Sequence, residues 1–359
     1  MQTESKTGAT RHPIVTQDLE AVTAAPLPWE DFAGKTVLIS GAAGFLPAYM
    51  VETLLLLNER RPEQRTRILG LVRHEGRARE RFAAYAGRPD LRLLVGDVAG
   101  PLGVDEKVDF IVHAASQASP KYYQTDPVGT LSANVLGTQR LLDLGREHGV
   151  TGFLFFSSGE VYGQITDAQV PTREEDYGYV DPTDVRSCYG ESKRMGETMC
   201  VCWHHQYGVP ACIARPFHTY GPAMSLTDGR VFADFVADIV AGRDIVMKSD
   251  GRATRAFCYL ADATAGFFTV LLKGESGQAY NVGNDRGEVS ILDLAHRLTA
   301  LFPEKGLKVV QQPVPASGYM QSKISRGCPE ISRARALGWE PHTTIEDGFR
   351  RTVLSFPEP

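Results

Sequence analysis

A tyrosine and a lysine stand four residues apart in the segment Tyr189-Gly-Glu-Ser-Lys193. In a helix this spacing puts both side chains on one face, where an ammonium group can lie beside a phenol. A phenol has an ordinary pKa of about 10, and a neighbouring positive charge lowers it. The pair could therefore take a proton from a hydroxyl group while a cofactor removes a hydride from the same carbon. Ser158, at the end of the apolar segment Phe153–Ser157, could bridge the substrate hydroxyl and the tyrosine oxygen.

A glycine-rich turn could hold such a cofactor. The apolar segment Thr36–Ser40 predicts a strand, Gly41-Ala-Ala-Gly44 follows it, and Ala48–Asn58 has helical spacing. Glycines let backbone N–H groups approach a pyrophosphate, which the N-terminus of a helix also attracts. Pro47 stands where a third glycine is usual, and proline is tolerated in the first turn of a helix. We therefore expect a bound dinucleotide.

The residue after the second predicted strand, Ile68–Val72, bears on the choice between NAD and NADP. An acidic residue there binds the ribose 2′-hydroxyl, whereas arginine suits a 2′-phosphate. This chain has Arg73, which taken alone favours NADP but could also stack on the adenine or be a solvated charge. We expect NAD, and Arg73 leaves NADP open. Asp97 and Val98, after the predicted strand Leu91–Val95, are expected near the adenine.

The remaining pattern predicts the fold class. Phe110–His113 and Phe153–Ser157 read as further apolar strands, with Val135–His148 as a helix between them. Apolar strands that alternate with helices indicate a parallel sheet covered on both faces, and right-handed crossovers then give an α/β, doubly wound (Rossmann) fold. After Pro216 the alternation loosens, although Val231–Ala241 and Ile291–Leu301 still look helical. We expect a smaller C-terminal substrate-binding lobe over the carboxyl ends of the strands.

This organisation divides the chain into three parts. Residues 1–33 are an N-terminal extension with a short helix around Thr16–Val22, which Trp29 and Phe32 could fix onto the main body. Residues 34–215 form the dinucleotide-binding part, to which 256–283 return. Residues 216–255 and 284–359 form the nucleotide-sugar-binding lobe.

Composition and charge narrow the function classes. Of 359 residues 43% are apolar and 23% charged, an ordinary globular balance. The net charge of −5 predicts neither a nucleic acid nor an anionic membrane as partner. No apolar run approaches the roughly 20 residues of a membrane span, and the polar start, Met1–Thr10, lacks the apolar core of a secretory signal. A cytoplasmic protein is expected.

One group of potential metal ligands needs a separate assessment. Cys200, Cys202, His204 and His205 lie close together in the sequence. Their segment has a helical pattern, in which side chains two residues apart point to different faces. We predict buried thiols and solvated histidines there, and no metal.

Taken together, the glycine turn, Ser158 and the Tyr189–Lys193 pair resemble the NAD-dependent epimerase/dehydratase family of extended short-chain dehydrogenases/reductases. Further motifs are similar to its nucleotide-sugar branch, and to UDP-glucuronate decarboxylases in particular, over roughly residues 35–353. These motifs are Ser157-Ser-Gly-Glu160-Val-Tyr-Gly163, Ala118-Ser-Pro120 with Tyr123, Asn134-Val-Leu-Gly-Thr138, Arg186-Ser-Cys-Tyr189, Asp228-Gly-Arg-Val231 and Thr254-Arg-Ala-Phe257.

The resemblance implies a role for each matching residue. The catalytic residues would be Ser158, Glu160, Tyr189 and Lys193, with Asn134 in support. The cofactor would contact Gly41, Gly44, Phe45, Leu46, Arg73, Asp97, Val98, Ala114, Ala115, Ser116, Tyr189, Lys193 and Pro216. The substrate would contact Ser119, Tyr123, Ser158, His218, Arg230 and Arg255, although related chains usually carry asparagine at the position of His218. A homodimer is also implied.

Positions 159 and 160 discriminate among the reactions of this branch. The 4,6-dehydratases carry Asp-Glu there as a proton donor and a base, decarboxylases carry Ser-Glu, and this chain has Gly159-Glu160. Transient oxidation of C4 in a uronic acid makes a β-keto acid, which loses carbon dioxide without an acid at position 159. The leading hypothesis is therefore UDP-glucuronate decarboxylation to UDP-xylose. The alternatives are a 4-epimerase or 4,6-dehydratase and, from a different class, a catalytically inactive dinucleotide-sensing protein.

Overall fold

The centre of the molecule is a seven-stranded sheet in a computed structural model that describes residues 10–312 and 325–357. Its strand order is β10-β6-β5-β4-β1-β2-β3, and every neighbouring pair is parallel. The strands are β1 (Thr36–Ser40), β2 (Arg67–Val72), β3 (Leu91–Val95), β4 (Phe110–His113), β5 (Gly152–Phe156), β6 (Ala211–Pro216) and β10 (Ala279–Val282). Because both faces of such a sheet are covered, side chains of both alternating sets must be apolar.

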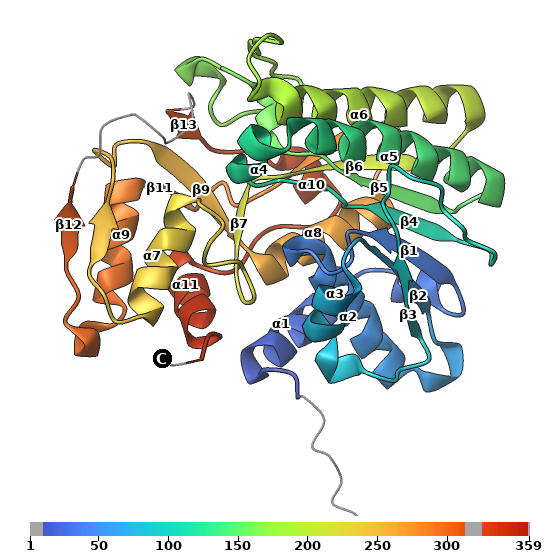
Figure 1. Ribbon diagram of the computed structural model, residues 1–359, viewed down its shortest axis with the longest axis horizontal. Coiled ribbons are helices and arrows are strands. Elements are labelled where there is room, and N and C mark those ends of the chain that lie inside the picture. The colour runs from blue at the N-terminus through green and yellow to red at the C-terminus, as the bar shows by residue number, and fades with distance from the viewer. Residues whose placement is uncertain (1–9, 313–324, 358–359) are drawn as a thin grey trace, which may run out of the picture.

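Helices cover the two faces (Figure 1). On one face lie α2 (Phe45–Arg60) and α8 (Leu260–Lys273), and on the other α5 (Pro127–His148) and α6 (Ser187–Tyr207) pack side by side. The shorter α3 (Glu75–Arg81) and α4 (Pro120–Thr125) lie in the connections after β2 and β4. This arrangement confirms the predicted doubly wound sheet.

Helix boundaries differ from the predicted ones mainly at the N-termini. Helix α2 begins at Phe45, directly after Gly44, and not at Ala48. Helix α5 begins at Pro127, because the Asp126 carboxylate accepts a hydrogen bond from Gly129 N and caps the first turn. The apolar pattern starts later than the cap in each case, so periodicity alone placed these starts too late.

The C-terminal half adds a smaller lobe, drawn at the left of Figure 1. Strands β7 (His218–Tyr220), β9 (Thr254–Tyr259), β11 (Glu288–Ser290) and β13 (Arg326–Gly327) form one sheet, and β8 (Ile245–Met247) pairs with β12 (Val309–Gln311). Helices α7 (Val231–Val240), α9 (Ile291–Ala300), α10 (Ser332–Ala336) and α11 (Ile345–Leu354) complete it. Its core is aromatic: Tyr220 stacks on Phe349 with ring centroids 3.8 Å apart.

The N-terminal helix α1 (Pro13–Thr23) is packed into the body against α2 and α8. Its Asp18 is 2% exposed and accepts hydrogen bonds from Tyr49 Oη (3.1 Å), Tyr259 Oη (2.8 Å) and Arg351 Nη2 (2.6 Å). These partners belong to α2, β9 and α11. A single buried carboxylate therefore connects the first helix with α2 beside the main sheet and with β9 and α11 of the lobe.

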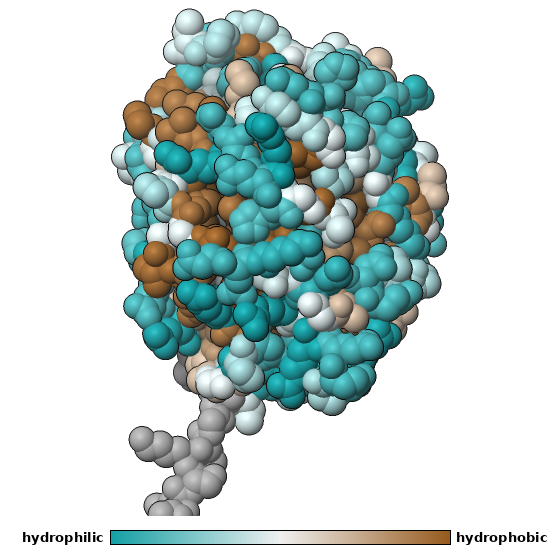
Figure 2. Space-filling model, turned by 90° about the vertical axis from the view of Figure 1, so that its right-hand side faces the viewer, coloured by the Kyte–Doolittle hydropathy of each residue, from teal (hydrophilic) through white to brown (hydrophobic). Residues whose placement is uncertain are grey.

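The surface is largely polar. Figure 2 shows one face on which hydrophilic side chains predominate and hydrophobic patches are scattered. Within the described residues, no helix is long and apolar enough to cross a membrane. Within the same ranges, no group of three histidine, cysteine or acidic side chains is arranged to hold a metal ion.

Candidate active site

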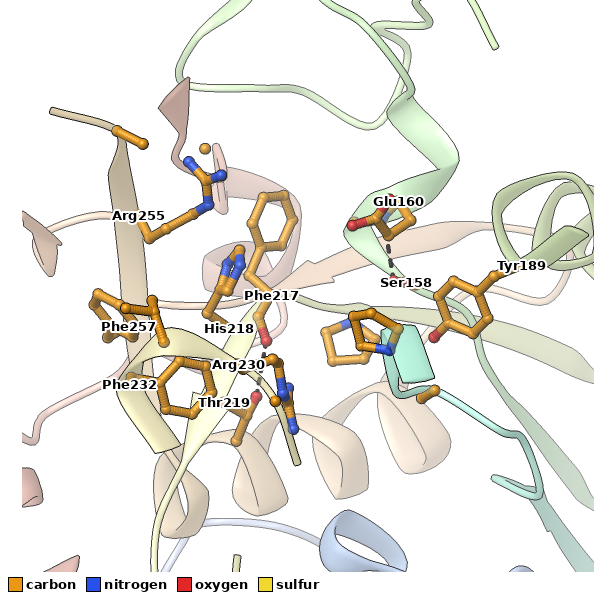
Figure 3. A pocket seen from close by; sticks show the side chains of 18 of the residues that line it. Ser158, Glu160, Tyr189, Phe217, His218, Thr219, Arg230, Phe232, Arg255 and Phe257 are labelled. Atoms are coloured by element: carbon orange, nitrogen blue, oxygen red, sulfur yellow. Dashed lines mark hydrogen bonds between the residues drawn. The ribbon is translucent and has the colours of Figure 1, made fainter. Parts of the chain in front are cut away.

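A cleft of about 540 Å³ lies between the carboxyl ends of the sheet strands and the lobe. Figure 3 shows its two walls. Tyr189 of α6 and Ser158, after β5, stand on one side, and His218 of β7 and Arg255 of β9 stand on the other. In open α/β sheets, ligands bind at this edge. The cleft is therefore where the sequence analysis expected cofactor and substrate.

The glycine turn lies at the body end of the cleft. Gly41 has φ +67° and its Cβ, if present, would lie 2.8 Å from Ala115 Cα, so only glycine fits. Gly41 N donates to Leu71 O (2.9 Å) and Gly44 N to Gly41 O (2.7 Å). The turn is thus held tightly against the end of β2 and leads directly into the N-terminus of α2.

The loop after β4 forms the facing side of this end. Ser40 Oγ accepts hydrogen bonds from Ala114 N (3.2 Å) and Ala115 N (3.1 Å) and lies 2.8 Å from His113 Nδ1. Ser116 Oγ lines the cleft and is buried without a partner in the described residues. Such a hydroxyl needs an acceptor or donor from a ligand. The glycine turn and Ser116 together fit a dinucleotide.

The side chains predicted to be catalytic meet in the middle of the cleft. Ser158 Oγ accepts from Glu160 N (3.2 Å) and lies beside the Tyr189 hydroxyl, where it lowers the pKa of the phenol. The Tyr189 ring stacks on Tyr123, with centroids 4.9 Å apart and planes 17° from parallel. Tyr123 Oη donates to Ala118 O (3.0 Å). Two neighbours therefore fix Tyr189, one through its oxygen and one through its ring.

Lys193 lies one turn along α6 from Tyr189, as its spacing predicted. It is 2% exposed, and its Nζ donates to Phe156 O (2.6 Å) and lies 5.8 Å from the centre of the Tyr189 ring. Burial lowers the pKa of Lys193 to about 7, and Glu197 opposes that shift. The ammonium is thus close to losing its proton at neutral pH.

The phenol of Tyr189 is a weak acid in this environment. Burial raises its pKa to about 12, the Ser158 hydrogen bond lowers it, Glu160 raises it and Arg230 lowers it. A group with that pKa is protonated at pH 7. Tyr189 therefore needs further positive charge nearby before it can act as a base.

The opposite wall carries cations and one neutral imidazole. Burial, followed by Arg255 and Arg230, lowers the pKa of His218 to about 3, so the ring is uncharged at neutral pH. His218 Nδ1 is buried without a partner in the part of the chain that the structure describes. Arg255 Nη1 donates to Thr254 O (2.7 Å), and Arg230 pairs with Asp228. Two guanidinium groups and an imidazole suit a diphosphate.

Most of the predicted site residues line this cleft. They are Gly44, Phe45, Leu46, Ala114, Ser116, Tyr123, Ser158, Glu160, Tyr189, Lys193, Pro216, His218, Arg230 and Arg255.

The others lie outside the lining. Gly41 lies within the glycine turn, in close approach to Ala115. Ser119 Oγ donates to Asp228 O (2.9 Å) and joins the start of α4 to the loop before α7. Val98 is buried against Gly137 of α5. Asp97 Oδ1 accepts from Ala99 N (2.8 Å). Their roles toward a ligand stay predictions.

Arg73 is exposed at the end of β2. Hydrogen bonds from Gln117 and Gly129 lower the pKa of Asp126, and the charge of Arg73 lowers it further. Arg73 therefore lies near the start of α5.

Arg186 stands in one of the motifs named above but had no predicted role. Arg186 lines the cleft, its Nη2 lies 3.8 Å from Glu160 Oε2, and its Nη1 is buried without a partner among the described residues. The spacing was a usable signal, because Arg186 is the N-cap of α6, three residues before Tyr189 and in helical backbone conformation. A buried, unsatisfied guanidinium nitrogen points to an anionic group on the ligand.

Comparison with known proteins gives the family. Residues 37–283 match the model of the NAD dependent epimerase/dehydratase family. The chain belongs to this family. The family membership predicted from the motifs is thereby confirmed, as is the expectation of an NAD-dependent enzyme of the extended short-chain dehydrogenase/reductase type.

Individual members of the family can also be compared. UDP-glucuronic acid decarboxylase 6 of Arabidopsis thaliana is 35% identical over 316 residues, which cover 87% of this chain and 86% of that protein. UDP-glucuronic acid decarboxylase 1 of Xenopus tropicalis is 33% identical over 325 residues, which cover 90% of this chain and 72% of that protein. The structure of UDP-glucuronic acid 4-epimerase from Bacillus cereus, in complex with UDP-glucuronic acid and NAD, has a TM-score of 0.75 at 21% identity and covers 89% of this chain and 98% of that one.

The glycine turn gives a first test of cofactor binding. We expect Gly41→Ala to lower NAD affinity by about tenfold or more, because the new methyl group must displace the Ala115 backbone. Gly34→Ala is a matched control, since Gly34 has the same φ of +67° but nothing within 4 Å of the added Cβ. Calorimetric titration with NAD measures both variants. Equal affinities would show that the close approach at Gly41 does not shape the cofactor site.

Arg73 gives a test of cofactor choice. If its guanidinium binds a 2′-phosphate, Arg73→Asp lowers affinity for NADP by about tenfold or more and leaves NAD binding unchanged or improved. Titration of the wild type and of Arg73→Asp with NAD and with NADP gives the ratio of the two affinities for each protein. An unchanged ratio would remove Arg73 from the choice of cofactor.

Proposed function

We propose that the protein decarboxylates a nucleotide-linked uronic acid, with UDP-glucuronate as substrate and UDP-xylose as product. The observation that carries the proposal is the pair Arg186–Glu160 beside Tyr189, together with the absence of any acid at Gly159. The curated relatives named above, which are UDP-glucuronic acid decarboxylases, support the same substrate. Residues 216–255 and 284–359 would bind the nucleotide diphosphate, with His218, Arg230 and Arg255 as its donors.

The first step is removal of the proton from the C4 hydroxyl. Tyr189 takes this proton, Ser158 holds the hydroxyl by a hydrogen bond, and Lys193 stabilises the phenolate. When bound, NAD would accept the hydride from C4, return it to C4 after carbon dioxide has left, and add the positive charge of its ring to the field on the phenol. With this additional charge, the high pKa of the free-protein phenol can fall towards neutrality.

Loss of carbon dioxide follows from the chemistry of the oxidised sugar. The C4 ketone lies β to the C6 carboxylate, so cleavage of the C5–C6 bond leaves its electron pair in an enolate at C4. The Tyr189 hydroxyl, now protonated, donates to this oxygen. Arg186 orients the carboxylate before cleavage. Glu160, whose side chain reaches solvent and lies 3.8 Å from Arg186, passes a proton from solvent to C5. No acid is required at position 159.

Three alternative functions can be compared with the same residues. A 4-epimerase would return the hydride to the other face of the C4 ketone and keep the carboxylate. A 4,6-dehydratase would need a proton donor for the C6 hydroxyl, and Gly159 has no side chain to supply one. A protein that only senses dinucleotide would have no use for a phenol fixed by Ser158 and Tyr123 beside a buried ammonium.

We also infer a homodimer formed through α5 and α6. Both helices carry large apolar side chains that are exposed in the single chain, namely Val128, Leu131, Leu136, Met195 and Val201. Burying such a surface against a second copy is favourable. We further infer a cytoplasmic location, because all six cysteines are free thiols, as is usual in a reducing compartment.

The product mass tests the reaction. We expect UDP-glucuronate to lose 44 mass units, the mass of carbon dioxide, whereas dehydration would remove 18 and epimerisation would change none. Tyr189→Phe should lower the rate by about 100-fold or more, since it removes the acid–base group, and should retain NAD. Mass spectrometry and proton spectra identify the product. Undiminished turnover by Tyr189→Phe would overturn the mechanism.

Arg186 tests the recognition of the carboxylate. We expect Arg186→Gln to lower kcat/KM for UDP-glucuronate by about 10- to 100-fold, the effect of losing a hydrogen bond to a charged group, and to leave UDP-glucose binding unchanged. Arg194→Gln is the control: Arg194 lies on the same helix but donates to Val161 O (2.7 Å) and Gly178 O (3.0 Å). Steady-state kinetics and UDP-glucose titration provide the readouts. Equal losses in the two variants would exclude a specific contact by Arg186.

A further inference from the structure

Behind the catalytic residues lies a buried charged cluster, formed by Glu197, Arg215 and Ser157. Glu197 is one turn after Lys193 on α6 and is 8% exposed, and Arg215 of β6 is 1% exposed. Arg215 Nε donates to Glu197 Oε1 (2.8 Å) and Arg215 Nη2 to Glu197 Oε2 (2.6 Å). The hydroxyl of Ser157 also donates to Glu197 Oε1. The carboxylate is therefore fully hydrogen-bonded although it is out of solvent.

The cluster connects the segments that carry the catalytic groups. Ser157 precedes Ser158 and follows Phe156, whose carbonyl accepts from Lys193. Arg215 also donates to Tyr162 Oη (3.0 Å), in the short 3-10 helix Gly159–Tyr162 that carries Glu160. The cluster thus joins α6, the end of β5, β6 and this helix.

Glu197 is also the carboxylate that most favours the charged form of Lys193. The other titratable neighbours of Lys193 are Tyr189 and Cys200 on its own helix and His113 at the end of β4. Burial and Lys193 itself lower the pKa of His113 to about 3, and burial raises that of Cys200. Both are uncharged at neutral pH, so neither replaces Glu197 as a counter-charge. Glu197 is in turn faced by Arg215, Tyr162 and Cys200.

We propose that Glu197 is a positioning residue that keeps Lys193 charged and, through Ser157, holds Ser158 in line with Tyr189. It touches neither substrate nor cofactor. This role rests on the proposed function, because a charged Lys193 matters only where Tyr189 acts as a base. Removing the carboxylate charge makes Lys193 lose its proton at lower pH, so Tyr189 keeps its own proton to higher pH.

Glu197→Gln tests the proposal, because it keeps the shape and removes the charge. In the pH profile of kcat, the alkaline limb should shift to lower pH by about one unit. At a pH above this limb, kcat should therefore be about tenfold lower than in the wild type. The phenolate absorbance of Tyr189, read as the difference from Tyr189→Phe in NAD-loaded protein without substrate, should appear at higher pH. The second measurement needs no turnover, so it separates this proposal from the identity of the substrate.

The matched control is Glu52→Gln. Glu52 is 3% exposed and pairs with Arg81 through two hydrogen bonds of 2.8 Å, but it lies on α2, across the sheet from Lys193. Glu52→Gln should lower the stability of the protein but should shift neither the alkaline limb of kcat nor the pH at which the Tyr189 phenolate appears. If Glu197→Gln titrates like wild type and Glu52→Gln, Glu197 is structural only and the proposal is wrong.

If Glu197→Gln does not fold, a second variant tests the proposed role of Glu197. Ser157→Ala deletes one hydroxyl and releases the end of β5 from Glu197. We expect kcat to fall about tenfold with KM unchanged. Wild-type kcat in a folded Ser157→Ala protein would overturn the proposal.

Discussion

A buried ammonium group sets the conditions that the rest of the active site must meet. Lys193 has lost nearly all contact with water, and an isolated charge in that position would give up its proton. The backbone carbonyl that accepts its hydrogen bond, Phe156 O, lies at the end of β5, and the carboxylate that favours its charged form, Glu197, lies one helical turn away. The helix, the strand end and the carboxylate must therefore keep their relative positions. The two helices on this face meet this demand by packing along their length, with Asn134 of α5 donating to Ser192 of α6 (2.9 Å).

The two ends of the cleft differ in the groups that could bind an anion. At the body end, backbone N–H groups and small side chains leave room for a pyrophosphate without placing a full positive charge beside it. At the lobe end, arginines surround a histidine that burial and the arginines themselves keep neutral. Between them, Tyr189 stands among apolar and aromatic neighbours that raise its pKa. The free protein therefore holds the Tyr189 phenol in its protonated form at neutral pH, and the proposed role of this phenol as a base requires a ligand that contributes positive charge.

Much of this could be predicted from the sequence. Apolar runs located β1 to β5, and the spacing of Tyr189 and Lys193 put them on one helix face. The boundaries that failed were set by caps and turns, as at Asp126, where hydrogen bonds and not apolar periodicity determine the first residue. The contacts of Arg186 with Glu160, and of Glu197 with Ser157 and Arg215, join residues that are 18 to 40 positions apart or belong to different elements. No local pattern encodes such pairings, because they arise only when the strands take their order in the sheet.

The junction at Asp18 has a consequence for how the protein is made. Its partners are spread from residue 49 to residue 351, so the carboxylate is buried with its full set of donors only after nearly the whole chain has left the ribosome. Until then, α1 has an acidic group that favours water over the protein interior. A chain that stops before α11 lacks Arg351, the guanidinium that pairs with Asp18 of the first helix.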